Sequence, residues 1–275
     1  MYIYLNGAKV HSAEATISLY DHGYLYGVGL FETFRTYSGK PFLFEEHLHR
    51  LVESCQQIGI EWTPERLKLQ EQIHDLLQVN DLHDGYFRLN VSAGPEAIGL
   101  PSDLYRHYTE ALLVKELPPA ITEKKLATLT LRRNTPEGAG RLKSHHYLNN
   151  ILAKREAPPD AEGVFLTGQG KVAEGIVSNL FFVKGETVYT PALTTGILNG
   201  ITREWVLKTA KELSLVIEEG EYDLSFAQQS DEVFVTNSIQ EIVPVYEWDQ
   251  CHYDRLRNKS VVGRLQEIYS QCTKA

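Results

Sequence analysis

The sequence is poor in cysteine and contains neither a cluster of basic residues nor a long apolar run. Its three cysteines, Cys55, Cys251 and Cys272, form no CxxC pair, a pattern typical of reduced thiols rather than of a disulfide framework. No apolar run approaches the roughly 20 residues that a membrane helix needs. The first residues, MYIYLNGAKV, do not follow the charged-then-apolar order of a signal peptide. We therefore expect a cytoplasmic protein that does not act at a membrane.

Positive charge is also scarce. The 27 lysines and arginines are outnumbered by 36 acidic residues, which gives a formal charge of −9. Because no basic block interrupts this excess, nucleic acid is not an expected partner. An anionic ligand such as a phosphate would need a local positive site.

Motifs for metal binding and for serine hydrolase chemistry are missing as well. His47 and His49 are two residues apart, and His145 and His146 are adjacent, so neither pair shares a helix face. There is no HExxH motif and no cysteine–histidine cluster, and GxSxG does not occur. We expect no metal site and no Ser–His–Asp triad.

The patterns that are present predict an α+β chain with two domains. Asn6-Gly7 predicts a hairpin, and Ser38-Gly39-Lys40 a second one between strands at 30–37 and 41–43. Helical spacing indicates helices at 44–58 and 63–79, and 85–93 is expected to be a strand. Two prolines in ELPPAITE, residues 116–123, indicate a linker. We predict a small α/β domain over residues 1–118 and a larger domain over residues 119–275.

The second domain is predicted to be strand-rich, with a curved or barrel-like sheet. Strands are expected at 164–167, 171–173, 176–183, 188–190, 231–236 and 241–247. Helices are expected at 145–155 and at 201–213, where the second helix follows Asn199-Gly200.

Two segments of this domain could bind an anion. In GILNGITR, Gly196 and Gly200 bracket a turn that leads into a helix, and free N–H groups at a helix start favour a phosphate. The Thr202 hydroxyl could add a donor, although Gly200 and Thr202 could also be an ordinary turn and cap. Thr236-Asn237-Ser238 ends an apolar strand, where small polar residues bind an anion or simply form a turn.

Three charged residues stand out by their surroundings. Lys143, in GRLKSHHYLNN, lies where a glycine-containing loop passes into a predicted helix. Leu142 and Tyr147 could shelter its amine, or it could be an ordinary solvated lysine. Glu174 follows an apolar strand, so a partner is required, either a salt bridge or a protonated ligand nitrogen. Arg50 lies beside the apolar stripe of its helix and could be an ordinary surface arginine.

Together these segments resemble the class-IV pyridoxal-phosphate enzymes, which include branched-chain aminotransferases, D-amino-acid aminotransferases and aminodeoxychorismate lyases. The resemblance spans nearly the whole chain, in the order of the family. It rests on DHGYLYGVGLFETFR, FLFEEHLHRL, RLKSHHYLNNILAKREA, GKVAEGIVSNLFFV, YTPALTTGILNGITRE and DEVFVTNSIQEIVPV. The segment RRNTPEGAGRLKSHHYLNNILAKRE is especially similar to the bacterial lyases.

The resemblance implies a fold and a set of cofactor contacts. The fold is that of the fold-type IV enzymes, with a pseudo-barrel second domain, the cofactor pyridoxal 5′-phosphate in the cleft between the domains, and usually a homodimer. Lys143 matches the lysine that carries the cofactor. The other implied contacts are Arg50, Ile201, Thr202, Ser238 and the Ile239 backbone on the phosphate, Glu174 on the pyridine nitrogen, and Tyr147, one residue out of register, on the phenolic oxygen.

The resemblance also implies a reaction, conversion of 4-amino-4-deoxychorismate to 4-aminobenzoate and pyruvate. Lys143 would then move the proton, and we predict that Thr33 protonates the leaving group, since residues 31 and 33 share a strand face. The D-amino-acid enzymes carry an arginine where this chain has Ala93. Candidates for the substrate carboxylates are Arg88, Arg35 and Arg141.

Two alternatives remain open. Arg88, in GYFR, resembles the Tyr-x-Arg of the branched-chain enzymes, so an aminotransferase of the same family, for branched-chain or D-amino acids, is the second candidate. A non-catalytic binding protein on this fold is the third, which the joint presence of the lysine, the acid and the phosphate residues disfavours.

Overall fold

The computed structural model describes residues 1–254 and 260–274. The chain forms two compact units. The first unit comprises Met1–Pro119 together with Leu142–His146, and the second comprises Ala120–Arg141 and Tyr147–Ala275. The short segment that contains Lys143 is therefore a part of the first unit, although both neighbouring segments belong to the second.

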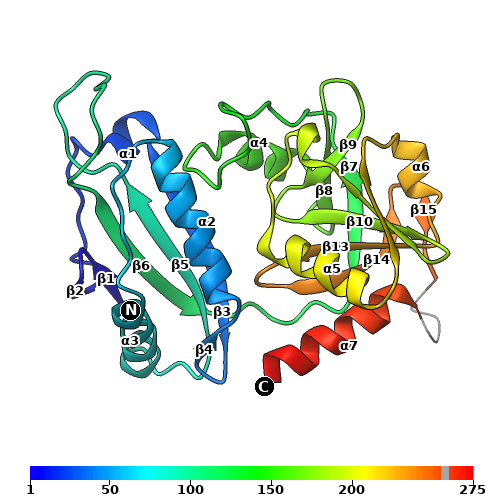
Figure 1. The fold of residues 1–275 in the computed structure, drawn as a ribbon, viewed down its shortest axis with the longest axis horizontal. Coiled ribbons are helices and arrows are strands. Elements are labelled where there is room, and N and C mark those ends of the chain that lie inside the picture. Colours follow the sequence, from blue (N-terminus) through cyan, green and yellow to red (C-terminus); the bar gives the residue numbers. More distant parts are fainter. Residues whose placement is uncertain (255–259, 275) are drawn as a thin grey trace. The chain divides into compact units, whose positions relative to one another are not determined.

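The first unit is built on a six-stranded antiparallel sheet (Figure 1). The strand order is β2 (Ala8–His11), β1 (Tyr2–Leu5), β6 (Thr109–Glu116), β5 (Gly85–Ser92), β3 (Gly29–Tyr37) and β4 (Lys40–Pro41). Both predicted hairpins are confirmed, and residues 6, 7, 38 and 39 at their turns all have positive φ, as tight hairpin turns require. A short helix, α1 (His22–Tyr26), precedes β3.

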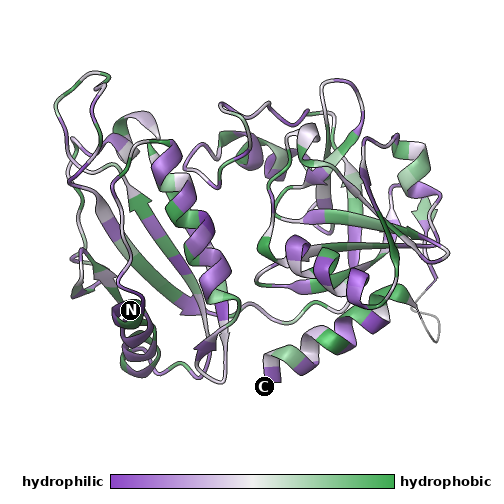
Figure 2. Cartoon of the chain, viewed as in Figure 1, coloured by the Kyte–Doolittle hydropathy of each residue, from purple (hydrophilic) through white to green (hydrophobic). Residues whose placement is uncertain are grey.

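Helices α2 (Phe44–Gln57) and α3 (Arg66–Val79) pack on one face of this sheet. Figure 2 shows the apolar stripe of α2, which buries Leu48, Leu51 and Cys55 in the core. The second helix, predicted to begin at residue 63, begins later, at Arg66. Residues 63 and 64 instead lie in the connection before α3.

The segment that carries Lys143 pairs with the edge of β3 opposite β5. The N–H of Phe31 donates to the Lys143 carbonyl at 2.9 Å, and the N–H of His145 donates to the Gly29 carbonyl at 2.9 Å. A Cβ atom on Gly29 would lie 2.4 Å from the His145 ring, so this close approach requires glycine. The predicted helix at 145–155 starts only at Leu148, because Ser144 pairs with Leu30 of β3 and the chain bends at His145.

The second unit contains a nine-stranded curved sheet, as predicted (Figure 1). Its order is β12 (Val216–Gly220), β11 (Thr187–Pro191), β10 (Asn179–Lys184), β13 (Glu232–Asn237), β14 (Glu241–Trp248), β7 (Lys124–Thr128), β8 (Glu162–Leu166) and β9 (Val172–Gly175), with β15 (Cys251–His252) beside β14. The strand predicted at 176–183 begins at Asn179, because residues 176–178 form a bend between β9 and β10.

In the described part of the second unit, four α-helices accompany this sheet: α4 (Leu148–Glu156), α5 (Ile201–Glu212), α6 (Leu224–Gln228) and α7 (Val261–Lys274). A short 3-10 helix, η1 (Leu193–Thr195), lies just before the Gly196 turn. Most strand residues of this sheet are apolar and buried, whereas α7 has both apolar and polar residues along its surface (Figure 2). No helix in the described part of the chain is both long and apolar enough to cross a membrane.

A buried charge cluster joins α2 to β3. Arg50 donates from Nε and Nη2 to the two carboxylate oxygens of Glu32, each at 2.7 Å, and His47 Nδ1 lies 2.7 Å from Glu32 Oε2. Burial alone would raise the pKa of Glu32, but the Arg50 guanidinium and His47 outweigh it and lower the pKa from 4.5 to about 2. Burial lowers the pKa of His47, so its ring is neutral at pH 7 and donates from Nδ1.

This cluster predicts a pH-dependent contribution to stability. The folded-state pKa of Glu32 is depressed, so its stabilisation is complete above pH 4.5 and is lost as the pH falls toward about 2. The shift corresponds to about 3 kcal/mol. We expect Glu32→Gln to lower the free energy of unfolding in urea at pH 6, with a much smaller deficit at about pH 3. Equal deficits at both pH values would contradict this assignment.

Candidate active site

The predicted site residues fall into two groups, one in each unit. In the first unit, Thr33, Arg35 and Arg88 lie on β3 and β5, on the sheet face opposite the helices. Arg50 lies on α2, and Lys143 lies in the segment Leu142–His146. Phe31, Thr33 and Arg35 alternate with the core residues Leu30 and Phe34, so they share one face, as expected. Arg88 of β5 lies directly opposite Thr33 and therefore belongs to the same face.

Phe31 lies at the centre of the first group. Lys143 Nζ is 4.6 Å from the centroid of its ring, and the Arg88 guanidinium carbon is 3.5 Å from the same centroid. Both distances are within the range of cation–π attraction. Arg88 also donates from Nε to Asn90 Oδ1 at 3.0 Å. The half-buried Lys143 is thus held by its backbone and by an aromatic ring, beside a second cation.

His145 belongs to this group, although no sequence motif indicated it. Its ring stacks on Phe31 with 6.4 Å between centroids, and its Nε2 is buried without a hydrogen-bond partner. Burial, with a further contribution from the Arg88 charge, lowers the pKa of His145 to about 4. The imidazole is therefore neutral at pH 7. The sequence shows only that His145 lies two residues after Lys143, and nothing in it predicts that the ring lies against Phe31.

Other candidates in the first unit have defined surroundings. Arg50 is not a surface arginine, since its side chain is 17% exposed and paired with Glu32. The Arg35 guanidinium lies 4.5 Å from the Tyr37 ring centroid. Ala93 is fully buried in the core.

In the second unit, Glu174 lies on β9 with 4% of its surface exposed. Its Oε1 accepts a hydrogen bond from Arg133 Nε at 2.8 Å, and its Oε2 accepts one from the Leu198 N–H at 3.0 Å. Arg141 Nε lies 3.8 Å from Oε1. The partner that burial demands is therefore an arginine, Arg133, which the sequence motifs did not identify.

Arg141 connects Glu174 to the Gly196 turn. It donates from Nε to the Gly196 carbonyl at 2.5 Å and from Nη2 to the Asn134 carbonyl. Burial, together with the charge of Arg133, lowers the pKa of Arg141 to about 10, so the side chain remains cationic at neutral pH. A role on a substrate carboxylate stays a prediction.

The start of α5 has the character of an anion site. Gly200 precedes the helix without a side-chain cap. Thr202 is 2% exposed, and its hydroxyl has no hydrogen-bond partner; the buried hydroxyl of Thr236, near the end of β13, has none either. Two buried hydroxyls without partners are costly, and together with the N–H groups of the first helical turn they fit a phosphate.

The turn that follows β13 is held by its own side chain. The N–H of Ile239 donates to Asn237 Oδ1 at 3.0 Å, and the N–H of Gln240 donates to the same oxygen at 2.8 Å. Ser238 is half-buried in this turn. The predicted phosphate donor at Ile239 is thus already engaged, and a ligand would have to share or replace its bond.

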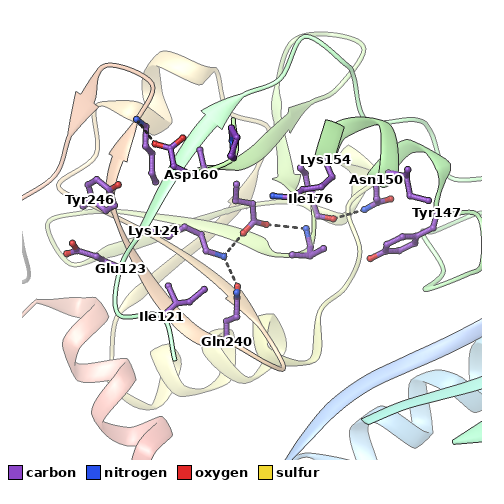
Figure 3. A pocket seen from close by; sticks show the side chains of 16 residues that line it. Ile121, Glu123, Lys124, Tyr147, Asn150, Lys154, Asp160, Ile176, Gln240 and Tyr246 are labelled. Atoms are coloured by element: carbon purple, nitrogen blue, oxygen red, sulfur yellow. Dashed lines mark hydrogen bonds and ion pairs between the residues drawn. The ribbon is translucent and has the colours of Figure 1, made fainter. Parts of the chain in front are cut away.

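Tyr147 directly precedes α4 and lines a cavity of about 580 Å³ in the second unit (Figure 3). The walls of the cavity are mostly apolar, and its polar members include Lys124, Glu162 and Gln240. Among the described residues, no three histidine, cysteine, aspartate or glutamate side chains gather closely enough to hold a metal ion.

Comparisons with known proteins show which proteins this chain is similar to. The chain is 42% identical to the aminodeoxychorismate lyase of Bacillus subtilis over 275 residues, covering 98% of this chain and 94% of that protein. It is 36% identical over 270 residues to a putative branched-chain-amino-acid aminotransferase of Methanocaldococcus jannaschii, covering 96% and 92%.

Among solved structures, the branched-chain aminotransferase of Thermoproteus uzoniensis with norvaline is similar with a TM-score of 0.88 and 27% identity, covering 100% of this chain and 95% of that one. This likeness confirms the predicted fold class. The family model described as amino-transferase class IV matches residues 29–248, which include every predicted site residue. The chain therefore belongs to the class-IV aminotransferase family.

Proposed function

We propose that this protein is a pyridoxal-phosphate-dependent lyase that converts 4-amino-4-deoxychorismate to 4-aminobenzoate and pyruvate. The observation that carries the proposal is the 42% identity, over 98% of the chain, to an aminodeoxychorismate lyase. The aminotransferases among the relatives are less similar, at 36% for the archaeal protein.

The cofactor of this family is pyridoxal 5′-phosphate, which supplies an electron sink for the carbon that bears the substrate nitrogen. Lys143 would carry it, and Glu174 would pair with its ring nitrogen. The phosphate would take the first-turn N–H groups at Ile201 and Thr202, with Arg50 and the Ser238–Ile239 turn as further contacts. Tyr147 would contact the phenolic oxygen. The buried Thr202 hydroxyl without a partner supports this assignment.

The chain must move two protons in the proposed reaction. Lys143 Nζ takes the proton from C4 of the substrate ring. The C3–O bond then breaks, the ring becomes aromatic, and the departing enolpyruvyl group needs a proton to become pyruvate. Thr33 is our proposed donor because it shares its sheet face with Phe31, against which Lys143 lies. Arg88, opposite Thr33, is the proposed partner of a substrate carboxylate.

An aminotransferase is the second candidate. Arg88 supports it equally, since an amino-acid carboxylate also needs a cation. The position of Ala93 disfavours an enzyme for D-amino acids, because this side chain is small and enclosed in the core.

We also propose that the protein is a homodimer. Large apolar side chains are exposed on the first unit at Leu19, Tyr20 and Tyr24, and again at Ile98 and Leu100. The two stretches are adjacent, since the N–H of Glu96 donates to the Tyr20 carbonyl and that of Gly99 to the Tyr26 hydroxyl. A patch of this kind typically marks an interface. Sedimentation equilibrium tests the proposal, and a monomer at micromolar concentration would refute it.

The assignment of Lys143 predicts that Lys143→Ala loses nearly all turnover, because no other amine would carry the cofactor and take the proton. Borohydride, which makes the lysine–cofactor bond irreversible, followed by peptide mapping should label Lys143 in the wild-type protein. Label on another lysine would show that the assignment is wrong. Lys208→Ala, on the exposed side of α5, is the matched control.

The start of α5 predicts a binding defect rather than a chemical one. Thr202→Val removes a hydroxyl that would donate to the phosphate, and a charge-assisted bond of this kind accounts for about a tenfold or larger change in affinity. Activity should recover substantially at saturating cofactor. Thr209→Val, the same substitution about two turns further along α5, should bind normally. Equal affinity in the two variants would remove Thr202 from the site.

The choice between lyase and aminotransferase predicts a difference in what the enzyme needs. A lyase completes its cycle without a keto-acid acceptor, whereas an aminotransferase requires one. With aminodeoxychorismate and no acceptor, we expect many turnovers with equal amounts of 4-aminobenzoate and pyruvate. With L-leucine, L-glutamate or D-alanine alone, the cofactor absorbance should change little. Rapid change with an amino acid, and no aminobenzoate, would support the aminotransferase.

A further inference from the structure

A buried ion pair in the second unit lies between two segments that are proposed to contact the cofactor. Lys124 Nζ is 2.5 Å from Glu162 Oε2, and the two side chains are 10% and 8% exposed. Neither residue carries a role in the proposed reaction. Burying two charges is expensive, so a pair at this position calls for an explanation.

The Glu162 carboxylate holds the bend that follows Glu174. Its Oε1 accepts hydrogen bonds from the Ser178 hydroxyl at 2.6 Å and from the Val177 N–H at 3.1 Å. Gly175 also faces this carboxylate, and a Cβ there would lie 2.5 Å from Oε1. The other side of the bend is held by Asn150, whose Nδ2 donates to the Ile176 carbonyl at 2.6 Å (Figure 3).

Lys124 extends the network to the second segment. Its Nζ donates to Gln240 Oε1 at 2.6 Å (Figure 3). Asn237 Nδ2 donates to the same oxygen at 3.1 Å, while Asn237 Oδ1 accepts from the N–H of Ile239. The conformation of the turn after β13 thus depends on an amide that is anchored by a buried lysine.

The same network continues back to the Glu174 carboxylate. Arg133 donates from Nε to Glu174, and from Nη1 to Asn150 Oδ1 at 3.2 Å. Hydrogen bonds and one short stretch of backbone therefore run without interruption from Glu174 to the N–H of Ile239, and Lys124 and Glu162 lie in the middle.

We propose that Lys124 and Glu162 are positioning residues, which act through Gln240 and the 176–178 bend to hold the two cofactor-contacting segments in register. The inference rests on the proposed function in one respect, that both segments contact the cofactor. The charges of Lys124 and Glu162 explain why they pair with each other. A buried carboxylate that accepts three hydrogen bonds needs a cation, and a buried cation cannot be left unpaired.

The inference predicts that Gln240→Ala and Lys124→Met each weaken cofactor binding about tenfold. The probe is 4′-deoxypyridoxine 5′-phosphate, an analogue that forms no bond to lysine, so its affinity reports the pocket alone. Gln240→Ala leaves the ion pair intact and should change the melting temperature of the apoprotein little. Lys125→Met is the matched control, because the neighbouring Lys125 pairs instead with Asp160 and Glu247.

A double variant shows whether Lys124 acts through Gln240 or independently of it. If Lys124 acts through Gln240, the Lys124→Met/Gln240→Ala protein should bind the analogue no more weakly than Lys124→Met alone, because residues on one path are not additive. Additive losses would overturn the proposal, and so would unchanged affinity in Gln240→Ala, which is expected to fold normally. A wild-type protein that binds the analogue but forms no aminobenzoate would refute the proposed lyase and leave this inference standing.

Discussion

The pairing of residues 143–145 with the edge of β3 is the constraint on which the first-unit part of the candidate site depends. Two backbone hydrogen bonds fix the main chain on either side of Ser144, and the Phe31 ring then receives the Lys143 amine. A lysine on a mobile loop would lose side-chain and backbone entropy each time it reached its target. Here that cost is met during folding, because backbone hydrogen bonds to β3 already hold the segment.

In both units, buried carboxylates hold neighbouring elements together through hydrogen bonds. In the first unit, Glu32 of β3 is hydrogen-bonded to Arg50 and His47 of α2. In the second unit, Glu174 accepts hydrogen bonds from Arg133 and from the Leu198 N–H. Glu162 pairs with Lys124 and accepts a hydrogen bond from the 176–178 bend. Each carboxylate accepts several directed hydrogen bonds, so each fixes the angle between elements that apolar packing alone would leave adjustable.

Local chemistry explains which parts of the structure the sequence could predict. Asn6-Gly7 specifies its hairpin without help from the rest of the chain, and the spacing of Leu48, Leu51 and Cys55 specifies α2. The pairing of residues 143–145 with β3 could not be predicted in this way, because the partner strand lies more than a hundred positions earlier. Similarly, nothing near Lys124 announces an ion pair with a residue 38 positions away or a contact with Gln240, 116 positions away. Sequence motifs predicted roles for Lys143 and Glu174 by their resemblance to a family, whereas Arg133 and His145 became candidates only through their contacts in the structure.

The division of the chain also has a topological consequence. Residues 120–141 belong to the second unit, residues 142–146 return to the first, and the chain then rejoins the second. A fragment that ends after Pro119 would keep the whole six-stranded sheet and the Phe31 ring but would lack the lysine that lies against this ring. The complementary fragment would carry that lysine with no sheet edge to receive it. Gene fusion or shuffling after Pro119 would therefore separate the Lys143 amine from the Phe31 ring against which it lies.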